Sequence, residues 1–482
     1  MRVHFIAIGG AVMNNLAIAL KQKGFDVSGS DDEIFDPAKS HLTEHGLLPE
    51  KFGWFAEKIT PELDAVILGM HAKHGNPELD RALELGLKIY SFPEYLYEQS
   101  KEKTRVVIAG SHGKTTITAM VLHILNYHKI DADYLVGAKL EGFDVMVRLT
   151  DAPIIVIEGD EYLTSALDLR PKFLHYKPNI ALISGIAWDH INVFPEYEGY
   201  LKQFELFIQS IQNNGSLVFC QEDEEVVKVV KNAFTGTISE NTLFRIPYKM
   251  PCFKIQTGTT FIQNCEKIEL EFLNTDVDSE NEFDFLIPES TPLQVFGKHN
   301  LLNINGAKLV CRELGITCPE FMEAIKTFKG ASNRLELVAK NENTAIFKDF
   351  AHAPSKLKAT VEAVKDQFPQ RELLAVMELH TFSSLSKAFL HQYRNCMTKA
   401  DIPVVFFDPH AIALKKLPPI NSDDVKDGFN NPNLQVFINP IDLETFIRSN
   451  DFKNKNLLMM SSGNFGGINL NNLANDLIRK IG

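Results

Sequence analysis

The residues with the clearest chemistry form a short glycine loop, Gly110–Thr116 (GSHGKTT). A β-branched run, Val106–Ile108, precedes the loop and apolar residues at helical spacing follow it, which predicts a strand, a loop and a helix. Glycines let backbone N–H groups surround an anion, and the helix N-terminus adds its positive dipole end. We therefore expect Lys114 to meet the β- and γ-phosphates of a nucleotide and the Thr115 hydroxyl to reach Mg²⁺. An ordinary turn could carry the same residues, but the flanking strand and helix favour phosphate binding.

Carboxylates follow the next strand of buried character. The apolar run Ile154–Ile157 ends in Glu158, Gly159, Asp160 and Glu161, so three acids lie within four residues. Hard oxygen ligands at the carboxyl end of a strand beside a phosphate loop suit Mg²⁺. A solvated acidic turn is the alternative interpretation, and the strand in front of the acids favours the metal.

A third strand end carries a histidine. The run Ile180–Ile183 is followed by Trp188, Asp189 and His190. An interior histidine satisfied by a hydrogen bond is the usual case for such a residue. Because three strand ends would converge on one edge of a sheet, we instead expect His190 to contact a metal ion or a phosphate.

The first segment of the chain has the pattern of a nucleotide-binding half-domain. A continuous apolar strand, Val3–Ile8, is broken by Gly9 and Gly10, and a second strand ends at Asp31. Ligands bind at the carboxyl ends of such strands. The loop does not match G-x-G-x-x-G, and Asp31 is either a ribose ligand or an ordinary strand-end acid.

Alternating strands and helices continue to the end of the chain. Period-2 alternation over Thr242–Val295 suggests antiparallel strands appended to the middle of the chain. Helical periodicity returns after Gly297–Asn300, where Asn300 is either a helix N-cap or a ligand. A third α/β block includes the strand Ala345–Asp349 and a glycine-rich segment, Ser461–Gly467.

Length and composition set the broad class. The 482 residues, 45% hydrophobic and 23% charged, suit about three globular domains. We place them at 1–102 (N-terminal, Rossmann-like), 103–330 (central, a P-loop ATPase fold with appended β-strands) and 331–482 (C-terminal, Rossmann-like), all of the α/β class. The net charge of −13 argues against a nucleic-acid or anionic-membrane partner. No apolar run reaches the ~18 residues of a membrane span, so we expect a cytoplasmic protein.

Taken together, the motifs resemble those of the Mur ligase family, ATP-dependent enzymes that form the amide bonds of bacterial cell-wall precursors. The resemblance covers essentially the whole chain. Six motifs occur in the family's order: Ile6–Met13 (IAIGGAVM), Ala109–Thr116 (AGSHGKTT), Glu158–Tyr162 (EGDEY), Asp189-His190, Gly297–Asn303 (GKHNLLN) and Asp349–Thr360 (DFAHAPSKLKAT). The resemblance implies that a UDP-linked sugar carboxylate binds the N-terminal domain, ATP the central domain and an amine the C-terminal domain. The γ-phosphate would activate the carboxylate as an acyl phosphate, which the amine then attacks.

The resemblance also implies roles for individual residues. Those implied to be catalytic are Lys114, Glu158 and His190. The implied Mg²⁺ ligands are Thr115 and Glu158 for one ion and His190 for a second. The implied nucleotide-binding residues are Gly110, His112, Gly113, Lys114, Thr115 and Thr116 in the loop, His299 and Asn303 for adenine, and Arg334 and Asp349 on the phosphate and ribose side. The implied ligands of the UDP-sugar are Gly9, Gly10, Asp31 and His112, with His112 near the sugar carboxylate.

Two segments point to one branch of the family. Tyr162–Asn179 and Met460–Ile468 resemble the recycling branch, which joins the tripeptide L-Ala-γ-D-Glu-meso-diaminopimelate to UDP-N-acetylmuramate. The alternative acceptor is L-alanine, used by the branch that acts in synthesis. Three places depart from the family pattern: Asn14-Asn15 after the first loop, Ala353 where a second histidine is usual, and Glu378–Thr381 in the amine domain.

Two functions of other classes are weighed against the ligase. A nicotinamide-dependent dehydrogenase would use the N-terminal sheet, but it would leave Lys114 and Glu158 without a role. A non-catalytic nucleotide-binding regulator is compatible with the unusual Glu378–Thr381 segment, and ATP binding without acceptor-dependent turnover would identify it.

Overall fold

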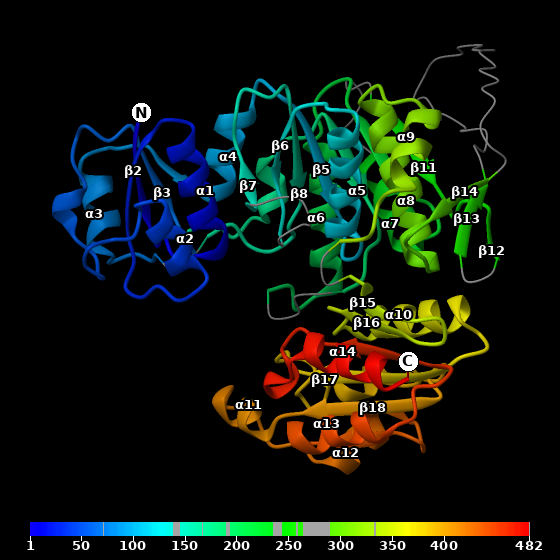
Figure 1. The fold of residues 1–482 in the computed structure, drawn as a ribbon. Helices are drawn as coiled ribbons and strands as arrows, with labels where there is room; N and C mark the ends of the chain where they lie inside the picture. The colour runs from blue at the N-terminus through cyan, green and yellow to red at the C-terminus, as the bar shows by residue number, and fades with distance from the viewer. Residues whose placement is uncertain are drawn as a thin grey trace, which may run out of the picture. The chain divides into compact units, whose positions relative to one another are not determined.

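The computed structural model describes residues 1–70, 72–137, 145–165, 167–188, 193–234, 243–256, 259–263, 290–331 and 334–481. The described chain divides into two compact units, each built from α-helices and β-sheets (Figure 1). The first unit holds residues 1–250 and 302–325, and the second holds 251–264, 288–301 and 326–482. Among the described helices, none combines the length and apolar character of a membrane span.

The N-terminal segment of the first unit forms a four-stranded parallel sheet in the order β2-β1-β3-β4. Its elements are β1 (Arg2–Ile6), α1 (Ala11–Gln22), β2 (Asp26–Ser30), α2 (Ala38–Glu44), η1 (Ala56–Lys58), β3 (Ala65–Leu68), α3 (Pro77–Glu84), β4 (Ile89–Ser91) and α4 (Phe92–Ser100). Polar caps begin two of the helices: the Asn76 side chain accepts hydrogen bonds at the start of α3, and Ser91 and Glu94 form a capping box at α4. The predicted alternation of strands and helices is confirmed here.

The rest of the first unit is organised around a seven-stranded sheet, β11-β10-β9-β5-β8-β6-β7. Its elements are β5 (Thr104–Ala109), α5 (Lys114–Tyr127), β6 (Ala132–Leu135), β7 (Val147–Arg148), β8 (Ile154–Glu158), η2 (Lys172–His175), β9 (Ile180–Ile183), α6 (Tyr197–Gln209), β10 (Ser216–Cys220), α7 (Glu224–Phe234), β11 (Phe244–Tyr248), α8 (Lys298–Glu313) and α9 (Cys318–Ile325). The central strands β5, β8 and β9 are parallel neighbours. Because both faces of β5 are covered, Val106, Val107 and Ile108 are fully buried.

The expectation of antiparallel strands across Thr242–Val295 is correct in part. The strands β12 (Phe253–Gln256), β13 (Thr259–Gln263) and β14 (Ser290–Leu293) form an antiparallel sheet, which belongs to the second unit. For β11 the expectation is wrong, because the helix α7 connects it to β10 as a crossover and the two strands pair in parallel. The alternating runs Lys267–Phe272 and Phe283–Ile287 lie outside the described residues.

The helix α8 begins earlier than the sequence suggests. Its first residue is Lys298, so Asn300 lies inside the first turn and is not the N-cap. The Asn300 side-chain amide instead donates to the Phe296 carbonyl at 2.8 Å. The division between the two units passes through this helix, after Leu301.

The second unit is organised around a six-stranded sheet, β15-β16-β20-β17-β18-β19, in which β15 is antiparallel to its neighbour and the other strands run parallel. Its elements are β15 (Glu336–Lys340), β16 (Ala345–Asp349), α10 (Pro354–Gln367), β17 (Glu372–Leu379), η3 (Leu390–Tyr393), β18 (Ile402–Phe407), α11 (Pro409–Leu414), α12 (Ser422–Phe429), β19 (Gln435–Phe437), α13 (Pro440–Ser449), β20 (Lys455–Met460), η4 (Phe465–Gly467) and α14 (Leu470–Ile481). The predicted α/β class is confirmed, with three sheets of mainly parallel strands and one small antiparallel sheet.

Candidate functional site

The glycine loop lies between β5 and α5, as predicted. Gly110 has φ +123° and Gly113 has φ +75°, backbone conformations that favour glycine. A Cβ atom on Gly110 would lie 2.4 Å from Ser184 Oγ, and one on Gly113 would lie 2.4 Å from Asn303 Oδ1. Neither position can therefore hold a larger residue without a shift of its neighbours. The close approach also places Asn303 of α8 against the loop.

Hydrogen bonds from the segment after β9 hold this loop in shape. The Ser111 hydroxyl donates to the Ala187 carbonyl at 2.8 Å and accepts from the Ala187 N–H at 2.9 Å. Since its proton is used, it accepts from the Tyr200 hydroxyl, which lies at 2.8 Å. The Ser184 hydroxyl donates to the His112 carbonyl. The loop is thus fixed by the fold before any ligand binds, which is the preorganisation that an anion site needs.

Lys114, the first residue of α5, is paired with an acid of the predicted metal turn. Its Nζ lies 2.7 Å from Glu161 Oε2 and donates to the Gly110 carbonyl at 2.7 Å. The side chains are 17% and 2% exposed, respectively. Burial acts to lower the pKa of Lys114, but Glu161, Asp160 and Glu158 outweigh it and raise that pKa above its ordinary value. Lys114 therefore carries its positive charge at neutral pH.

The other two acids of the turn have different partners. Glu158, at the end of β8, accepts from the Thr115 hydroxyl at 2.7 Å and from the Gly137 N–H at 2.8 Å. Asp160 pairs with Lys172 at 2.6 Å. Among the described residues, Glu158 is thus the acid of this turn that has neutral donors and no cation partner. A carboxylate and a hydroxyl side by side are hard oxygen donors, so Glu158 and Thr115 fit Mg²⁺ better than the other two acids do.

Two histidines are expected beside this edge. His190 lies outside the described residues. His112 lies inside the loop, and its Cδ2 would be 4.0 Å from a Cβ atom on Gly185. Thr116 is buried in the first turn of α5.

Gly9 and Asp31 meet at the end of the N-terminal sheet. Asp31 Oδ2 accepts from the Gly9 N–H at 2.7 Å, and Oδ1 accepts from the Asp32 N–H at 3.0 Å. A Cβ atom on Gly9 would lie 2.9 Å from the same Asp31 oxygen. Burial raises the pKa of the Asp31 carboxyl. Asp31 therefore holds the Gly9–Gly10 loop in shape. Its spacing from the loop in the sequence could not distinguish this structural role from ligand binding.

The Asn14–Asn15 departure is accommodated inside α1. Asn14 donates to the Gly10 carbonyl at 2.8 Å, and Asn15 donates to the Ala11 carbonyl at 2.8 Å. Asn15 Oδ1 also accepts from the Met146 N–H at 3.2 Å, beside β7. Both asparagine amides thus form hydrogen bonds at positions where small residues are usual, and α1 still packs.

In the second unit, Arg334 and Asp349 come together at the end of β16. Asp349 accepts from the N–H groups of Leu335 and Ala351, both at 2.5 Å. Burial raises the pKa of Asp349 to about 6, although the Arg334 charge acts to lower it. The Arg334 guanidinium lies 5.0 Å from the centre of the Phe350 ring.

His299 lies in a small cavity of about 80 Å³ formed within the second unit by β12, β13 and α10. Desolvation lowers its pKa to about 4, so the imidazole is neutral at physiological pH. A neutral imidazole can accept or donate a hydrogen bond but adds no charge, which suits an uncharged ligand group such as a nucleobase.

A buried acid marks the carboxyl end of β17. Glu378 is 3% exposed in a strand whose other inward positions are apolar. Its Oε2 accepts from the Ser461 hydroxyl and, at 2.8 Å, from the Phe465 N–H. Its Oε1 lies 3.8 Å from Nδ1 of His380, whose side chain is 39% exposed. A Cβ atom on Gly463 would lie 2.8 Å from the same histidine nitrogen, so a larger residue there would require the neighbouring side chains to shift.

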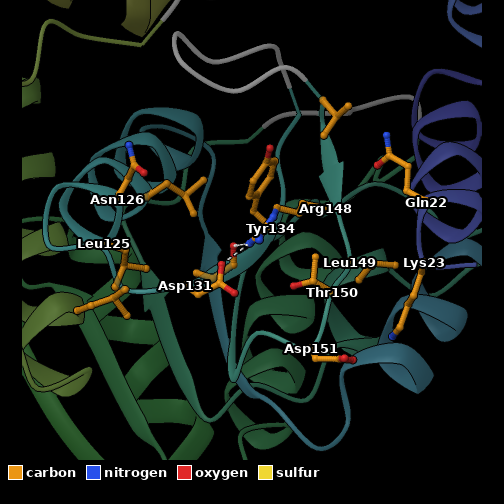
Figure 2. Close-up of a pocket in the computed structure, with 14 residues that line it drawn as sticks. Gln22, Lys23, Leu125, Asn126, Asp131, Tyr134, Arg148, Leu149, Thr150 and Asp151 are labelled. Carbon is orange, nitrogen blue, oxygen red and sulfur yellow. Dashed lines mark hydrogen bonds and ion pairs between the residues drawn. The ribbon is translucent and has the colours of Figure 1, made fainter. Parts of the chain in front are cut away.

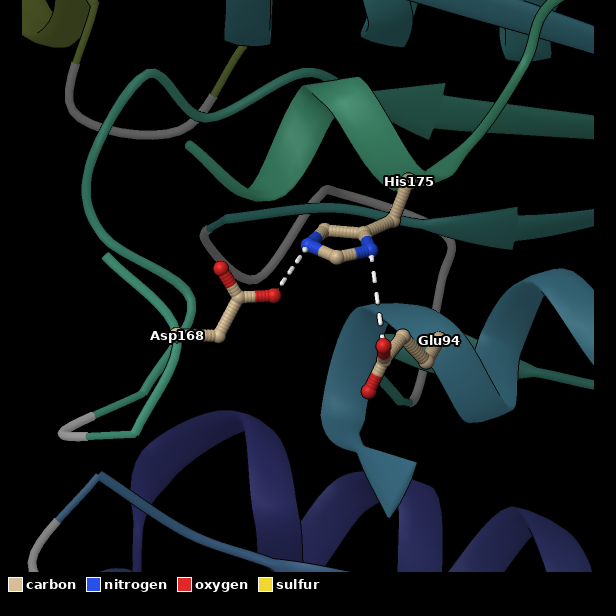
Figure 3. A group of neighbouring side chains, drawn as sticks. All are labelled: Glu94, Asp168 and His175. Atoms are coloured by element: carbon tan, nitrogen blue, oxygen red, sulfur yellow. Dashed lines mark ion pairs between the residues drawn. The ribbon is translucent and has the colours of Figure 1, made fainter. Parts of the chain in front are cut away.

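Glu94, Asp168 and His175 form a separate cluster in the first unit (Figure 3). His175 Nε2 lies 3.2 Å from Asp168, and Nδ1 lies 3.9 Å from Glu94. Arg170 pairs with Asp168 at 2.7 Å and with Glu94 at 3.8 Å. Because the Arg170 guanidinium already pairs with both carboxylates, this cluster ties α4 to the loop before η2 and is a poor metal site.

Another cavity, of about 710 Å³, is lined by residues of α5, β6 and β7 and of the segments beside them (Figure 2). Its walls include Asn126 at the end of α5, Asp131 before β6 and Asp151 before β8. Arg148 is tied to Asp131 at 2.8 Å. These residues flank the amino ends of strands, whereas ligands of parallel sheets bind at the carboxyl ends. The cavity is therefore not the nucleotide site.

Comparison with known proteins points to one family. The model of the Mur ligase family catalytic domain matches residues 2–104, and that of the Mur ligase middle domain matches residues 108–311. A Haemophilus influenzae UDP-N-acetylmuramate–L-alanyl-γ-D-glutamyl-meso-2,6-diaminoheptandioate ligase is 27% identical over 97% of each chain. A Clostridium kluyveri UDP-N-acetylmuramate–L-alanine ligase is 30% identical over 82% of this chain and 81% of the relative.

Solved structures show the same fold. A murein peptide ligase from Psychrobacter arcticus has a TM-score of 0.59 at 22% identity, covering 100% of this chain and 99% of that one. A UDP-N-acetylmuramate-alanine ligase from Thermotoga maritima has a TM-score of 0.66 at 20% identity, with the same coverage.

Proposed function

Because the chain belongs to the Mur ligase family of ATP-dependent, amide-forming ligases, we propose that it joins UDP-N-acetylmuramate to the tripeptide L-Ala-γ-D-Glu-meso-diaminopimelate. This reaction would return a recovered peptide to a cell-wall precursor. The alternative is the same chemistry with L-alanine as the acceptor. The dehydrogenase does not explain why a lysine, a hydroxyl and three acids gather at the phosphate loop, whereas the regulator differs from the ligase in its lack of turnover.

The observation that carries the ligase function is the arrangement of Lys114, Thr115 and Glu158 at one edge of the central sheet. In the proposed reaction the sugar carboxylate attacks the γ-phosphorus of ATP, the bond to ADP breaks and an acyl phosphate forms. The acceptor amine then loses a proton and attacks the acyl carbon, which forms the C–N bond and releases phosphate. Lys114 offsets the repulsion between carboxylate and phosphate, and Mg²⁺ bound at Thr115 and Glu158 would supply further positive charge.

We assign the remaining ligand contacts on the same basis. His190 would bind a second Mg²⁺, and His112 would lie near the sugar carboxylate. The proposed ligands of the UDP group are Gly9, Gly10 and Asp31, and those of the nucleotide outside the loop are His299, Asn303, Arg334 and Asp349. The neutral imidazole of His299 supports a nucleobase contact, and the carboxylate of Asp349 supports a contact to ribose hydroxyls.

Three domains would share this work: 1–102 for the UDP-sugar, 103–330 for ATP and 331–482 for the acceptor. One matched family model ends at residue 104 and the other begins at residue 108, which supports a domain boundary near residue 102.

The carboxyl edge of the C-terminal sheet supports the tripeptide as the acceptor, because it presents an imidazole, an ammonium group and an aromatic ring. His380 is backed by Glu378, and Lys415 lies 5.1 Å from the ring centre of Phe382, which is 61% exposed. An imidazole, an ammonium group and an exposed ring at one sheet edge suit the carboxylates of a long peptide better than they suit alanine.

The test is acceptor-dependent release of phosphate. Purified protein with ATP, Mg²⁺ and UDP-N-acetylmuramate should release phosphate only after an acceptor is added, and faster with tripeptide than with alanine. No release with either acceptor would reject both ligase functions. ATP-dependent thermal stabilisation without any turnover would favour the regulator.

A further inference from the structure

The ion pair between Lys114 and Glu161 has a consequence for nucleotide binding. A lysine that must meet phosphate is held 2.7 Å from a carboxylate that is only 2% exposed. Glu161 is three residues beyond Glu158, the proposed Mg²⁺ ligand, and has a different partner. The acidic turn therefore places one particular carboxylate, that of Glu161, beside the phosphate-loop lysine.

We propose that Glu161 is the counter-ion of the phosphate-loop lysine in the nucleotide-free enzyme, and that the triphosphate of ATP must displace it from Lys114. Glu161 is then a positioning residue that sets the affinity for ATP. This inference rests on the proposed function, because it takes ATP to be the ligand of the loop.

The charges around the loop explain why such a counter-ion is needed. The Lys114 side chain is 17% exposed, and an ammonium group taken out of water is costly unless it is paired. Glu158 cannot serve, because its two oxygens accept from the Thr115 hydroxyl and the Gly137 N–H. Asp160 is paired with Lys172 at 2.6 Å. Of the three acids, Glu161 is the one in contact with the Lys114 ammonium.

The same geometry makes Glu161 a competitor of the phosphates. Lys114 also donates to the Gly110 carbonyl at 2.7 Å, so its ammonium is directed at its own loop and at Glu161. A phosphate that takes over this ammonium must replace the carboxylate and tolerate its negative charge nearby. Part of the favourable energy of ATP binding is therefore lost in breaking the pair.

Glu161→Gln removes the charge and keeps the size of the side chain. We expect the dissociation constant for ATP to fall about tenfold, because the competing carboxylate is gone. We also expect the nucleotide-free protein to melt at a lower temperature, because Lys114 loses its partner, and the stabilisation by saturating ATP to be larger than in the wild type.

Asp160→Asn is the matched control. It removes one negative charge from the same turn, but that charge is paired with Lys172 and not with Lys114. A general electrostatic effect would tighten ATP binding in both variants, whereas displacement from Lys114 predicts tightening only in Glu161→Gln. Glu161→Ala also removes the charge and should tighten ATP binding, which provides a second variant if Glu161→Gln folds poorly.

The decisive measurement is calorimetric titration of ATP into the wild type, the three variants, Lys114→Met and the Lys114→Met/Glu161→Gln double variant. The account predicts that Glu161→Gln tightens binding in the wild-type background and has no effect when Lys114 is absent. Unchanged or weaker binding by Glu161→Gln, equal tightening by Asp160→Asn, or the same tightening without Lys114 would each overturn it. If the wild type itself fails to bind ATP, the proposed function fails instead, so the two failures are distinguishable.

Discussion

Two glycine loops follow strands at the carboxyl edges of two different sheets, and they handle charge in opposite ways. Gly110–Gly113, after β5, leads into a helix whose first residue is Lys114, with acids facing that lysine. Ser461–Gly467, after β20, instead closes over an acid: Phe465 N–H and the Ser461 hydroxyl both donate to Glu378. The first loop presents a cation that an incoming phosphate can take over. The second loop already surrounds an anionic group of the protein, the carboxylate of Glu378.

The difference shows why a glycine loop alone does not indicate nucleotide binding. The donors of the second loop are used by a carboxylate of the same chain, so the loop stabilises Glu378 and, through it, the position of His380. We therefore assign ATP to the first loop and the acceptor to the second. Changes in the two loops should therefore affect the use of different substrates.

Replacing the lysine of the first loop should have the largest effect. Lys114→Ala removes the cation that offsets the charge on the transferred phosphoryl group, and we expect turnover to fall by about 10³-fold or more. Phosphate release measures this loss, and a circular dichroism spectrum like that of the wild type shows that the fold is intact. Turnover within a few fold of the wild type would refute the role of Lys114.

A smaller effect is expected from the backbone of the same loop. Gly113→Ala places a Cβ atom at φ +75° and 2.4 Å from Asn303 Oδ1, so the loop or the Asn303 side chain must move. We expect ATP affinity to fall about tenfold or more. Gly199→Ala is a suitable control, because nothing lies within 4 Å of the added atom. Equal ATP affinity in the two variants would argue against a preorganised loop.

The second loop should respond through the acceptor and not through ATP. His380→Ala removes the half-exposed imidazole beside Glu378, and we expect the KM for the tripeptide to rise about tenfold. The KM for ATP should change by less than twofold. Steady-state kinetics with each substrate varied in turn separates the two values, and a rise in both would contradict the division of labour between the loops.

The smallest effect concerns pH. The pKa of Asp349 is raised by burial to about 6, so the group is ionised at pH 7 and takes up a proton as the pH falls through 6. If the carboxylate accepts from ribose hydroxyls, ATP affinity should fall severalfold between pH 7 and pH 5. Asp349→Asn should bind more weakly at pH 7 and lose this part of the pH dependence. Titrations at both pH values give the comparison, and parallel pH profiles for the two proteins would exclude the contact.

The sequence predicts the first loop well because its structure is local. The strand, the two glycines and the helix lie within one continuous segment, and their order determines their geometry. The N-terminal and C-terminal α/β blocks are predicted for the same reason, since periodicity reports which residues face a core.

Local sequence patterns could not predict which partner each charged group contacts. Glu158, Asp160 and Glu161 are nearly adjacent in sequence, yet they bond to Thr115, Lys172 and Lys114. Which acid meets which partner depends on how the strand ends are arranged in the folded sheet. The pair of Glu378 and Ser461 is likewise formed by two residues 83 positions apart in sequence, one at the end of β17 and one just after β20. Local patterns also misplaced the start of α8, because the polar residues Lys298–Asn300 begin the helix before its first apolar residue.

The most direct test of the central claim is a competition between acceptors. The protein is incubated with ATP, Mg²⁺, UDP-N-acetylmuramate and equal concentrations of L-Ala-γ-D-Glu-meso-diaminopimelate and L-alanine, and the nucleotide-linked products are identified by mass. The account predicts that the tripeptide adduct forms in large excess over the alanine adduct. Predominance of the alanine adduct would assign the enzyme to the synthetic branch, and the absence of both adducts would contradict the ligase function itself.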